Sequence, residues 1–322
     1  MFFKKINNKN KTEETLSAEV SEQMPEKHAP VYIIGDNALT CYLAAKIAPV
    51  RKTIIISGTS ENTSLSTNGI TFKEERTLQK KHCTFQTSFM IREKPEAVII
   101  AASPHKIKAA TAAAASKNIG DAPILCFTPL KNFNLFTGLF NENIFRAFFD
   151  GYLSLENQLL SQLGRQPSVT LCMDEKNSCF PVIKELFSAS DIAIHPETNE
   201  TSAFWNYLTP YAAGSLLSAY FNKNLALITK DKSLRDNIKP LVKELCAIAR
   251  SEIETINEDD ILKKLYNTPN SYVYPLQAEF SLGKIGELDS LSSCFLDISQ
   301  KKKLPDTEIR KILNKLYNII LA

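Results

Sequence analysis

Short runs of apolar residues alternate with helix-like stretches over the first 200 residues, and this alternation predicts the fold. The apolar runs are VYIIG at 31–35, KTIIIS at 52–57, EAVIIAAS at 96–103, APILCF at 122–127, SVTLCM at 168–173 and DIAIH at 191–195. Nearly continuous apolar strands separated by helices are typical of a parallel sheet that is covered on both faces. We therefore expect an α/β fold with a Rossmann-like, doubly wound parallel sheet.

From about residue 200 onward, the apolar positions repeat at helical spacing only. One helix face is formed by Leu234, Ile238, Leu241, Leu245 and Ile248. A last helix is expected to begin at Pro305 and Asp306, because proline is common in the first turn of a helix. The pattern predicts a Rossmann-like dinucleotide-binding domain at 30–199, followed by an all-helical C-terminal domain at 200–322.

The first 29 residues are polar and charged, and we expect them to form a disordered tail without a signal peptide. The net charge is only +3 and the signs are interleaved, which argues against nucleic-acid binding. No apolar run approaches the roughly 20 residues that cross a bilayer, so no membrane segment is expected. Seven scattered cysteines without a C-x-x-C pair argue against a metal site and favour a reducing, cytoplasmic location.

The turn after the first strand is the main candidate for cofactor binding. Dinucleotide-binding loops usually read G-x-G-x-x-G, whereas this loop consists of Gly35, Asp36, Asn37, Ala38, Leu39 and Thr40. Asn37 and Thr40 replace the second and third glycines, and Asp36 adds a negative charge where a phosphate would bind. Two readings stay open, a weakened cofactor loop and a purely structural turn.

The end of the second strand bears on the choice of cofactor. It lacks the acidic residue that binds a ribose 2′-hydroxyl, and instead it carries Ser57, Thr59 and Ser60. Their hydroxyl groups could bind a 2′-phosphate, so NADP is favoured over NAD if a dinucleotide binds. The alternative is an ordinary polar loop.

Two stretches of the helical half carry a family resemblance: FWNYLTPYAAGSLLSAYFNKN from Phe204 and EFSLGKIGELDSL from Glu279. Together with the loop at Gly35 and the stretch TNGITF at 67–72, they resemble ketopantoate reductase, also called 2-dehydropantoate 2-reductase. The resemblance implies NADPH-dependent reduction of a small 2-keto acid in a cleft between two domains. In the family this step converts 2-dehydropantoate to pantoate in pantothenate biosynthesis. A homodimer also fits this resemblance.

The resemblance places the substrate side of the site on four residues. Tyr207 stands where the family has its proton-donating lysine, and Tyr211 and Ser215 stand where it has substrate-binding asparagines. Glu287, in GELD, matches a family site residue outright. Tyr207 and Glu287 are therefore the candidate catalytic residues, and Tyr211 and Ser215 are the candidate substrate ligands.

The aromatic residues of the same helix can also be interpreted as purely structural. Trp205, Tyr207 and Tyr211 could be aromatic packing between the domains, and Pro210 is expected to bend the helix because proline removes one of its hydrogen bonds.

On the cofactor side, the resemblance places Ser103 at the family's lysine after the third strand, and Thr128 at its N-G loop. The loop glycines, the lysine and the asparagines are thus replaced together. Two functions stay open: a reductase whose activity is weak or lost, and a non-catalytic binding or scaffold protein that retains the fold. An enzyme with new chemistry in the same cleft is a third, with Tyr207 and Lys223 as available acids.

Overall fold

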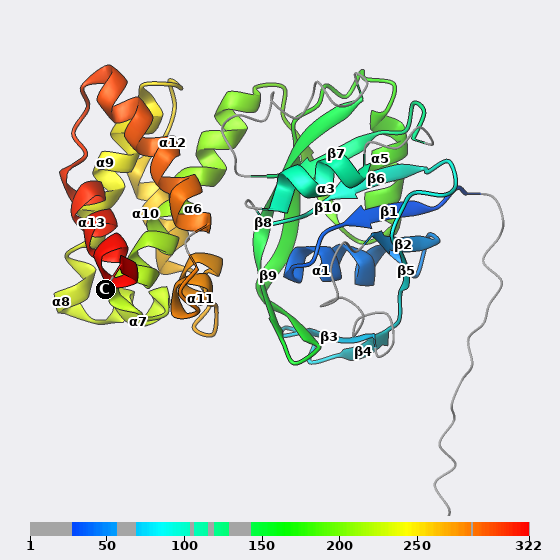
Figure 1. Cartoon of the computed structure of the whole chain (residues 1–322), viewed down its shortest axis with the longest axis horizontal. Coiled ribbons are helices and arrows are strands. Elements are labelled where there is room, and N and C mark those ends of the chain that lie inside the picture. The colour runs from blue at the N-terminus through cyan, green and yellow to red at the C-terminus, as the bar shows by residue number, and fades with distance from the viewer. Residues whose placement is uncertain are drawn as a thin grey trace, which may run out of the picture.

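The computed structural model describes residues 28–56, 69–103, 106–114, 119–128, 143–284 and 286–321. Figure 1 shows a sheet with helices on its faces beside a group of helices that contains the C-terminus. Residues 1–27 of the expected polar tail lie outside the described residues, so the disorder of the tail stays a prediction.

The parallel part of the sheet follows the order β7-β6-β1-β2-β5. Its strands are β1 (Val31–Ile34), β2 (Thr53–Ile56), β5 (Gln86–Ser88), β6 (Ala97–Ile100) and β7 (Ile124–Phe127). Apart from the short β5, these are strands that the apolar runs predict. The Rossmann-like α/β fold class is confirmed.

Side chains of the central strand β1 alternate between two cores, which explains why the strand is apolar at every position. Val31 and Ile33 pack on the side of α1 (Ala38–Ile47) and α5 (Phe180–Ala189). Tyr32 and Ile34 pack on the other side, with α3 (Ile107–Ala114). A strand covered on both faces has no position where a polar side chain would reach water.

A long antiparallel hairpin extends this sheet, and the apolar runs predict only its last residues, 168–171. The hairpin consists of β8 (Ile144–Glu156) and β9 (Leu159–Leu171). β8 runs parallel to β7, while β9 also pairs with β3 (Ile70–Glu74) and β10 (Ala193–Pro196). β4 (Lys80–Cys83) completes this edge as the antiparallel partner of β3. The outer half of β8 is only partly buried, so its sequence lacks a continuous apolar run.

The hairpin register shifts between Asp150 and Tyr152, next to Gly151. A Cβ on Gly151 would lie 2.7 Å from Pro167 Cβ and 2.8 Å from the Phe149 ring, so a larger residue does not fit without movement. Such irregularities bend a strand and redirect its side chains. Here the shift lies where β8 passes the helical part.

After β10 the described chain contains helices only. They are α6 (Glu200–Phe221), α7 (Leu225–Lys230), α8 (Lys232–Arg235), α9 (Ile238–Arg250), α10 (Glu258–Tyr266), α11 (Pro275–Ser281), α12 (Gly286–Lys302) and α13 (Thr307–Leu321). α9 and α13 match the two helices that the periodicity predicts. α6 continues through Pro210 as one helix and packs against α7, α9, α10, α11 and α13.

Contacts between β8 and α6 join the helical part to the sheet. The buried Arg146 of β8 donates to Glu200 at 3.2 Å, and its guanidinium lies 4.4 Å from the centre of the Phe204 ring. Phe148 of β8 belongs to the same apolar core as the helices.

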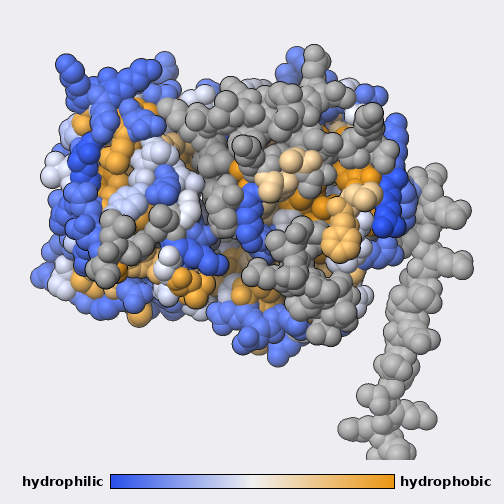
Figure 2. Space-filling view, viewed as in Figure 1, coloured by the Kyte–Doolittle hydropathy of each residue, from blue (hydrophilic) through white to orange (hydrophobic). Residues whose placement is uncertain are grey.

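The surface in Figure 2 shows hydrophilic side chains over much of the outer edge of the helical part. Across the described helices, none combines the length and the apolar character that spanning a membrane requires.

Candidate functional site

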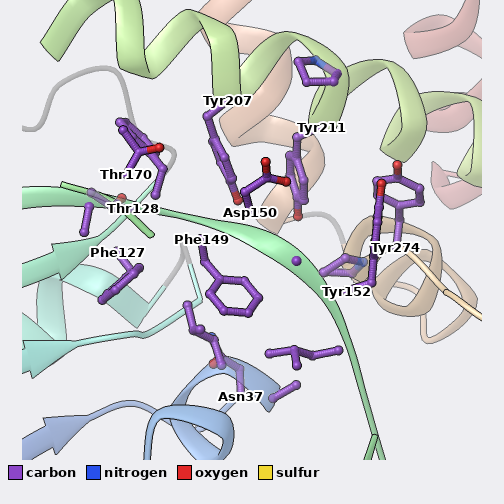
Figure 3. A pocket seen from close by; sticks show the side chains of 18 of the residues that line it. Asn37, Phe127, Thr128, Phe149, Asp150, Tyr152, Thr170, Tyr207, Tyr211 and Tyr274 are labelled. Carbon is purple, nitrogen blue, oxygen red and sulfur yellow. The ribbon is translucent and has the colours of Figure 1, made fainter. Parts of the chain in front are cut away.

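A cavity of about 420 Å³ lies where the first turn of α1, the middle of β8 and α6 meet (Figure 3). The sheet part lines it with Asn37, Ala38, Leu39, Ala102, Ser103, Phe127, Thr128, Asp150 and Tyr152, among others. The helical part lines it with Asn206, Tyr207, Pro210, Tyr211, Lys264, Tyr272, Tyr274, Glu279 and Glu287, among others. The structure therefore brings the candidate cofactor loop and most of the candidate substrate residues to one cavity.

The loop after β1 keeps a tight turn although only its first glycine remains. A Cβ on Gly35 would lie 2.3 Å from the Ala101 carbonyl oxygen and 2.3 Å from Thr40 Oγ1. Asn37 is the N-cap of α1, and its side chain accepts a hydrogen bond from the Thr40 backbone N–H at 3.0 Å. Thr40 is fully buried and donates from its hydroxyl to the Ala101 oxygen at 2.8 Å. Asn37 thus caps α1, and Thr40 ties α1 to the residue after β6, at the position where the third glycine usually allows close packing.

These replacements affect how an anion could bind at the start of α1. The Asn37 side chain uses one of the N–H groups that a helix N-terminus offers to a phosphate. A phosphate at this loop would have fewer donors than it has at a glycine-rich loop.

Asp36 is not an isolated negative charge, because Lys106 forms an ion pair with its Oδ2. The pair joins the loop after β1 to the segment after β6. Its other oxygen, Oδ1, is buried and has no hydrogen-bond partner within the described part of the chain. Lys106 therefore offsets the repulsion between Asp36 and a phosphate that the sequence suggests.

If this loop binds a dinucleotide, as proposed below for NADPH, replacing Lys106 with methionine should weaken that binding by about tenfold, which corresponds to 1.4 kcal/mol. The substitution keeps a long apolar side chain but leaves Asp36 without its counter-charge. Asp36→Asn should have the opposite effect, and the double variant should bind NADPH about as well as wild type. Quenching of nucleotide fluorescence at low salt measures all four proteins. Equal affinities for Lys106→Met and wild type would contradict an electrostatic role of the pair.

The other candidates on the cofactor side are Ser103, Thr128 and Ser57. Ser103 and Thr128 both line the cavity, and the Thr128 carbonyl accepts a hydrogen bond from Arg146 Nε at 3.3 Å. Ser57 lies outside the described residues, together with the rest of the loop after β2. The contribution of that loop to NADP binding stays a prediction.

Tyr207 and Tyr211 project from α6 toward β8, one helical turn apart (Figure 3). Their rings lie nearly parallel with centroids 5.7 Å apart, and Phe148 stacks on Tyr207 at 5.0 Å. Tyr274 contacts Tyr211 at 6.0 Å and Tyr272 at 4.8 Å. The reading as aromatic packing between the two parts is thus correct for Tyr207, which stacks on Phe148 of β8. The ring contacts of Tyr211 and Trp205 lie within the helical part, and both Tyr207 and Tyr211 also line the cavity.

Glu287 begins α12 and lies against this aromatic row. Its side chain accepts a hydrogen bond from the Tyr211 hydroxyl, and its backbone N–H donates to Glu279 Oε2 at 3.2 Å. Because it is 2% exposed, burial raises the pKa of Glu287 to about 8. Burial and the nearby Glu287 raise the pKa of both Tyr207 and Tyr211. At neutral pH, all three groups therefore hold protons.

In the helical part, two sequence candidates lie away from the cavity lining. Ser215 is buried in the core of the helical part, and Lys223 is an exposed residue after the end of α6. The substrate role of Ser215 stays a prediction.

Other cavity residues escaped the sequence reasoning because they are distant in the chain. Asp150 reaches the cavity from the irregular part of β8, and its carboxylate pairs with Arg165 at 2.5 Å. Tyr274 fits against α6 because residue 214 is glycine: a Cβ there would lie 2.2 Å from the Tyr274 ring. The one sequence signal for this contact was the small-residue run AAGS within α6. No group of His, Cys, Asp and Glu suited to a metal ion occurs among the described residues.

Several solved structures resemble the whole chain. A D-mandelate dehydrogenase, solved with NADH and anilino(oxo)acetate, superposes with a TM-score of 0.77 at 13% identity, over 91% of this chain and 100% of that one. A ketopantoate reductase from Ralstonia eutropha gives 0.75 at 16% identity, over 90% and 98% of the two chains. A dimeric ketopantoate reductase from Staphylococcus aureus gives 0.71 at 15% identity, over 90% and 98%. The chain has the ketopantoate reductase fold.

The resemblance that the sequence motifs carry is therefore confirmed at the level of the fold. No protein-family profile matches the chain, and no curated protein matches its sequence. The similarity that the comparisons show thus lies in the backbone arrangement.

Proposed function

We propose that this chain is a divergent member of the ketopantoate reductase family, which binds NADP(H) and slowly reduces a 2-keto acid. One observation carries the proposal: a single cavity is lined by the first turn of α1 and by the tyrosine and glutamate side chains of α6 and α12. A reductase needs a dinucleotide loop and a proton donor on opposite sides of one substrate.

The residues at the loop fit a dinucleotide, with fewer interactions than a glycine-rich loop provides. Gly35 keeps the tight turn, Ala38 is small, and Asp36 is paired with Lys106. When bound, NADPH supplies the hydride. The three hydroxyl residues after β2, beginning at Ser57, favour NADP over NAD.

The residues on the substrate side suit a small 2-keto acid. Lys264 lines the cavity and supplies a positive charge for the substrate carboxylate, while Arg165 balances Asp150. The protonated side chains of Tyr207, Tyr211 and Glu287 are available to protonate the alkoxide that follows hydride transfer. A tyrosine stabilises negative charge less than the family's lysine does, so we expect slow turnover.

Wild-type protein should bind NADPH more tightly than NADH and should oxidise it slowly when a 2-keto acid is added. Fluorescence titration gives the two affinities, and the loss of NADPH absorbance gives the rate. Ketopantoate and phenylglyoxylate are both tested, since the aromatic lining and the bound ligand of the mandelate dehydrogenase favour an aryl substrate. Absence of NADPH binding at millimolar concentration would refute the proposal.

A non-catalytic binding protein is the second candidate, and the capped loop favours it. The backbone N–H and the hydroxyl of Thr40 are donors that a phosphate could use, but they already donate to the Asn37 side chain and to the Ala101 oxygen. Absence of NADPH binding at millimolar concentration, from a protein that is folded, would support this candidate.

Partners and location follow from the same proposal. We propose a homodimer, because a structural neighbour is dimeric, and a cytoplasmic location, because NADPH-dependent metabolism occurs there. Light scattering at micromolar concentration tests the dimer.

A further inference from the structure

The geometry points to Tyr211, hydrogen-bonded to Glu287, as the proton donor of the reduction, in place of Tyr207. This inference rests on the proposed function and names the acid that serves it. Both residues line the cavity, and the Tyr211 hydroxyl donates directly to Glu287 Oε1.

The hydrogen bond to Glu287 distinguishes Tyr211 from Tyr207, the other tyrosine of α6 that lines the cavity. Among the described residues, the Tyr207 hydroxyl has no hydrogen-bond partner, and its ring is held between Phe148 and Tyr211. A tyrosine that gives up its proton leaves a phenolate, which requires another proton in a buried site. Tyr211 can obtain that proton from Glu287, whereas Tyr207 has no such neighbour.

The surroundings of Glu287 keep it protonated. On α6 it faces Tyr207 and Tyr211, both neutral, and Tyr272 approaches it from the segment before α11. The hydrogen bond from Tyr211 lowers the pKa of Glu287, while the negative charge of Glu279 on α11 raises it. Burial is the largest cause of the shift, so the carboxyl group carries its proton up to about pH 8.

The proposed step balances without any additional reactant. When bound, NADPH would supply a hydride to the carbonyl carbon, and the C=O π electrons would move to the oxygen as an alkoxide. Tyr211 would then give its O–H proton to that alkoxide oxygen. The Glu287 carboxyl proton then passes to the Tyr211 oxygen, which leaves a carboxylate. Glu287 regains a proton from solvent after the hydroxy acid and NADP⁺ leave.

The test compares Tyr211→Phe, Tyr207→Phe and Glu287→Gln with wild type in single-turnover assays, with enzyme in excess over NADPH. Tyr211→Phe should lower the rate by about 100-fold or more, the usual effect of removing a positioned acid. Tyr207→Phe should cause a much smaller loss. Tyr220→Phe, which changes a tyrosine of α6 outside the cavity lining, should leave the rate unchanged.

Two readouts do not depend on turnover. Each variant should bind NADPH with the same affinity as wild type, because none of the substituted residues lies on the cofactor loop. The infrared carbonyl band of a protonated carboxyl group should be present in wild type at neutral pH, disappear above about pH 8, and be absent from Glu287→Gln. The wild-type rate should fall over the same pH range.

Specific outcomes would overturn the inference. If Tyr211→Phe retains the wild-type rate while Tyr207→Phe is inactive, Tyr207 is the donor and the proposed function still holds. If wild type binds NADPH but reduces no 2-keto acid, the proposed function fails and the inference fails with it. If no protonated carboxyl band is found, Glu287 cannot resupply Tyr211.

Discussion

Gly35→Ala should lower the free energy of unfolding by about 3 kcal/mol or more, since forcing extra atoms into a packed region costs this much. The new Cβ would lie 2.3 Å from the Ala101 carbonyl oxygen, which belongs to the backbone and cannot rotate away. It would also lie 2.3 Å from Thr40 Oγ1, so relief would break the Thr40 hydrogen bond to Ala101. The start of α1 would then separate from the end of β6.

Gly283→Ala is the matched control for Gly35→Ala. Its φ of +69° is also in the region that favours glycine, but a Cβ there would have open space within 4 Å. We expect a cost of about 1 kcal/mol from backbone strain alone. Urea unfolding followed by the fluorescence of the buried Trp205 measures both variants. Equal losses for the two substitutions would show that the contact with Ala101 is not what requires glycine at position 35.

Glu287→Gln should raise the free energy of unfolding at pH 9, on the order of 3 kcal/mol, even though it removes a proposed catalytic group. The pKa of Glu287 is raised from 4.5 to about 8, so the folded protein holds a proton that the unfolded chain releases. The Glu287 side chain therefore makes its full contribution to the free energy of unfolding of the wild type below about pH 4.5. That contribution decreases as the pH rises to about 8. Glutamine stays neutral and can still accept the Tyr211 hydrogen bond.

The difference between variant and wild type should accordingly be small at pH 4.5 and largest above pH 8. Unfolding in urea at several pH values gives the curve. Glu175→Gln, at an exposed glutamate, should show no such trend. A variant less stable than wild type at pH 9 would contradict a protonated Glu287. A stabilising substitution at this position would also indicate that the buried acid is kept for function, because activity and stability often conflict at such sites.

Much of the sheet could be predicted because its central strands are local patterns. β1, β2, β6 and β7 are apolar at nearly every position, since both faces of each strand are covered. The helices α9 and α13 could be predicted for the same reason, because one apolar face repeats every three or four residues. β8 could not, because its outer half lies at a partly open surface, where no single periodicity is required.

The candidate site was predictable only in part. The motifs pointed to Asn37, Tyr207, Tyr211 and Glu287, and all four line one cavity in the structure. They did not indicate which side chains pair. Asp36 appeared to repel a phosphate until the structure placed Lys106, 70 positions away, beside it.

The sequence by itself determined the central strands β1, β2, β6 and β7, the helices α9 and α13, the tight turn at Gly35 and the short motifs that resemble ketopantoate reductase. Each of these depends on residues within a few positions of one another, whose backbone preferences and apolar spacing act locally. The tertiary structure alone decided that Tyr211 and Glu287, 76 positions apart, share a hydrogen bond, and that burial keeps the Glu287 carboxyl protonated. A pKa depends on how much water and charge surround a group, and those surroundings exist only after distant segments have packed together.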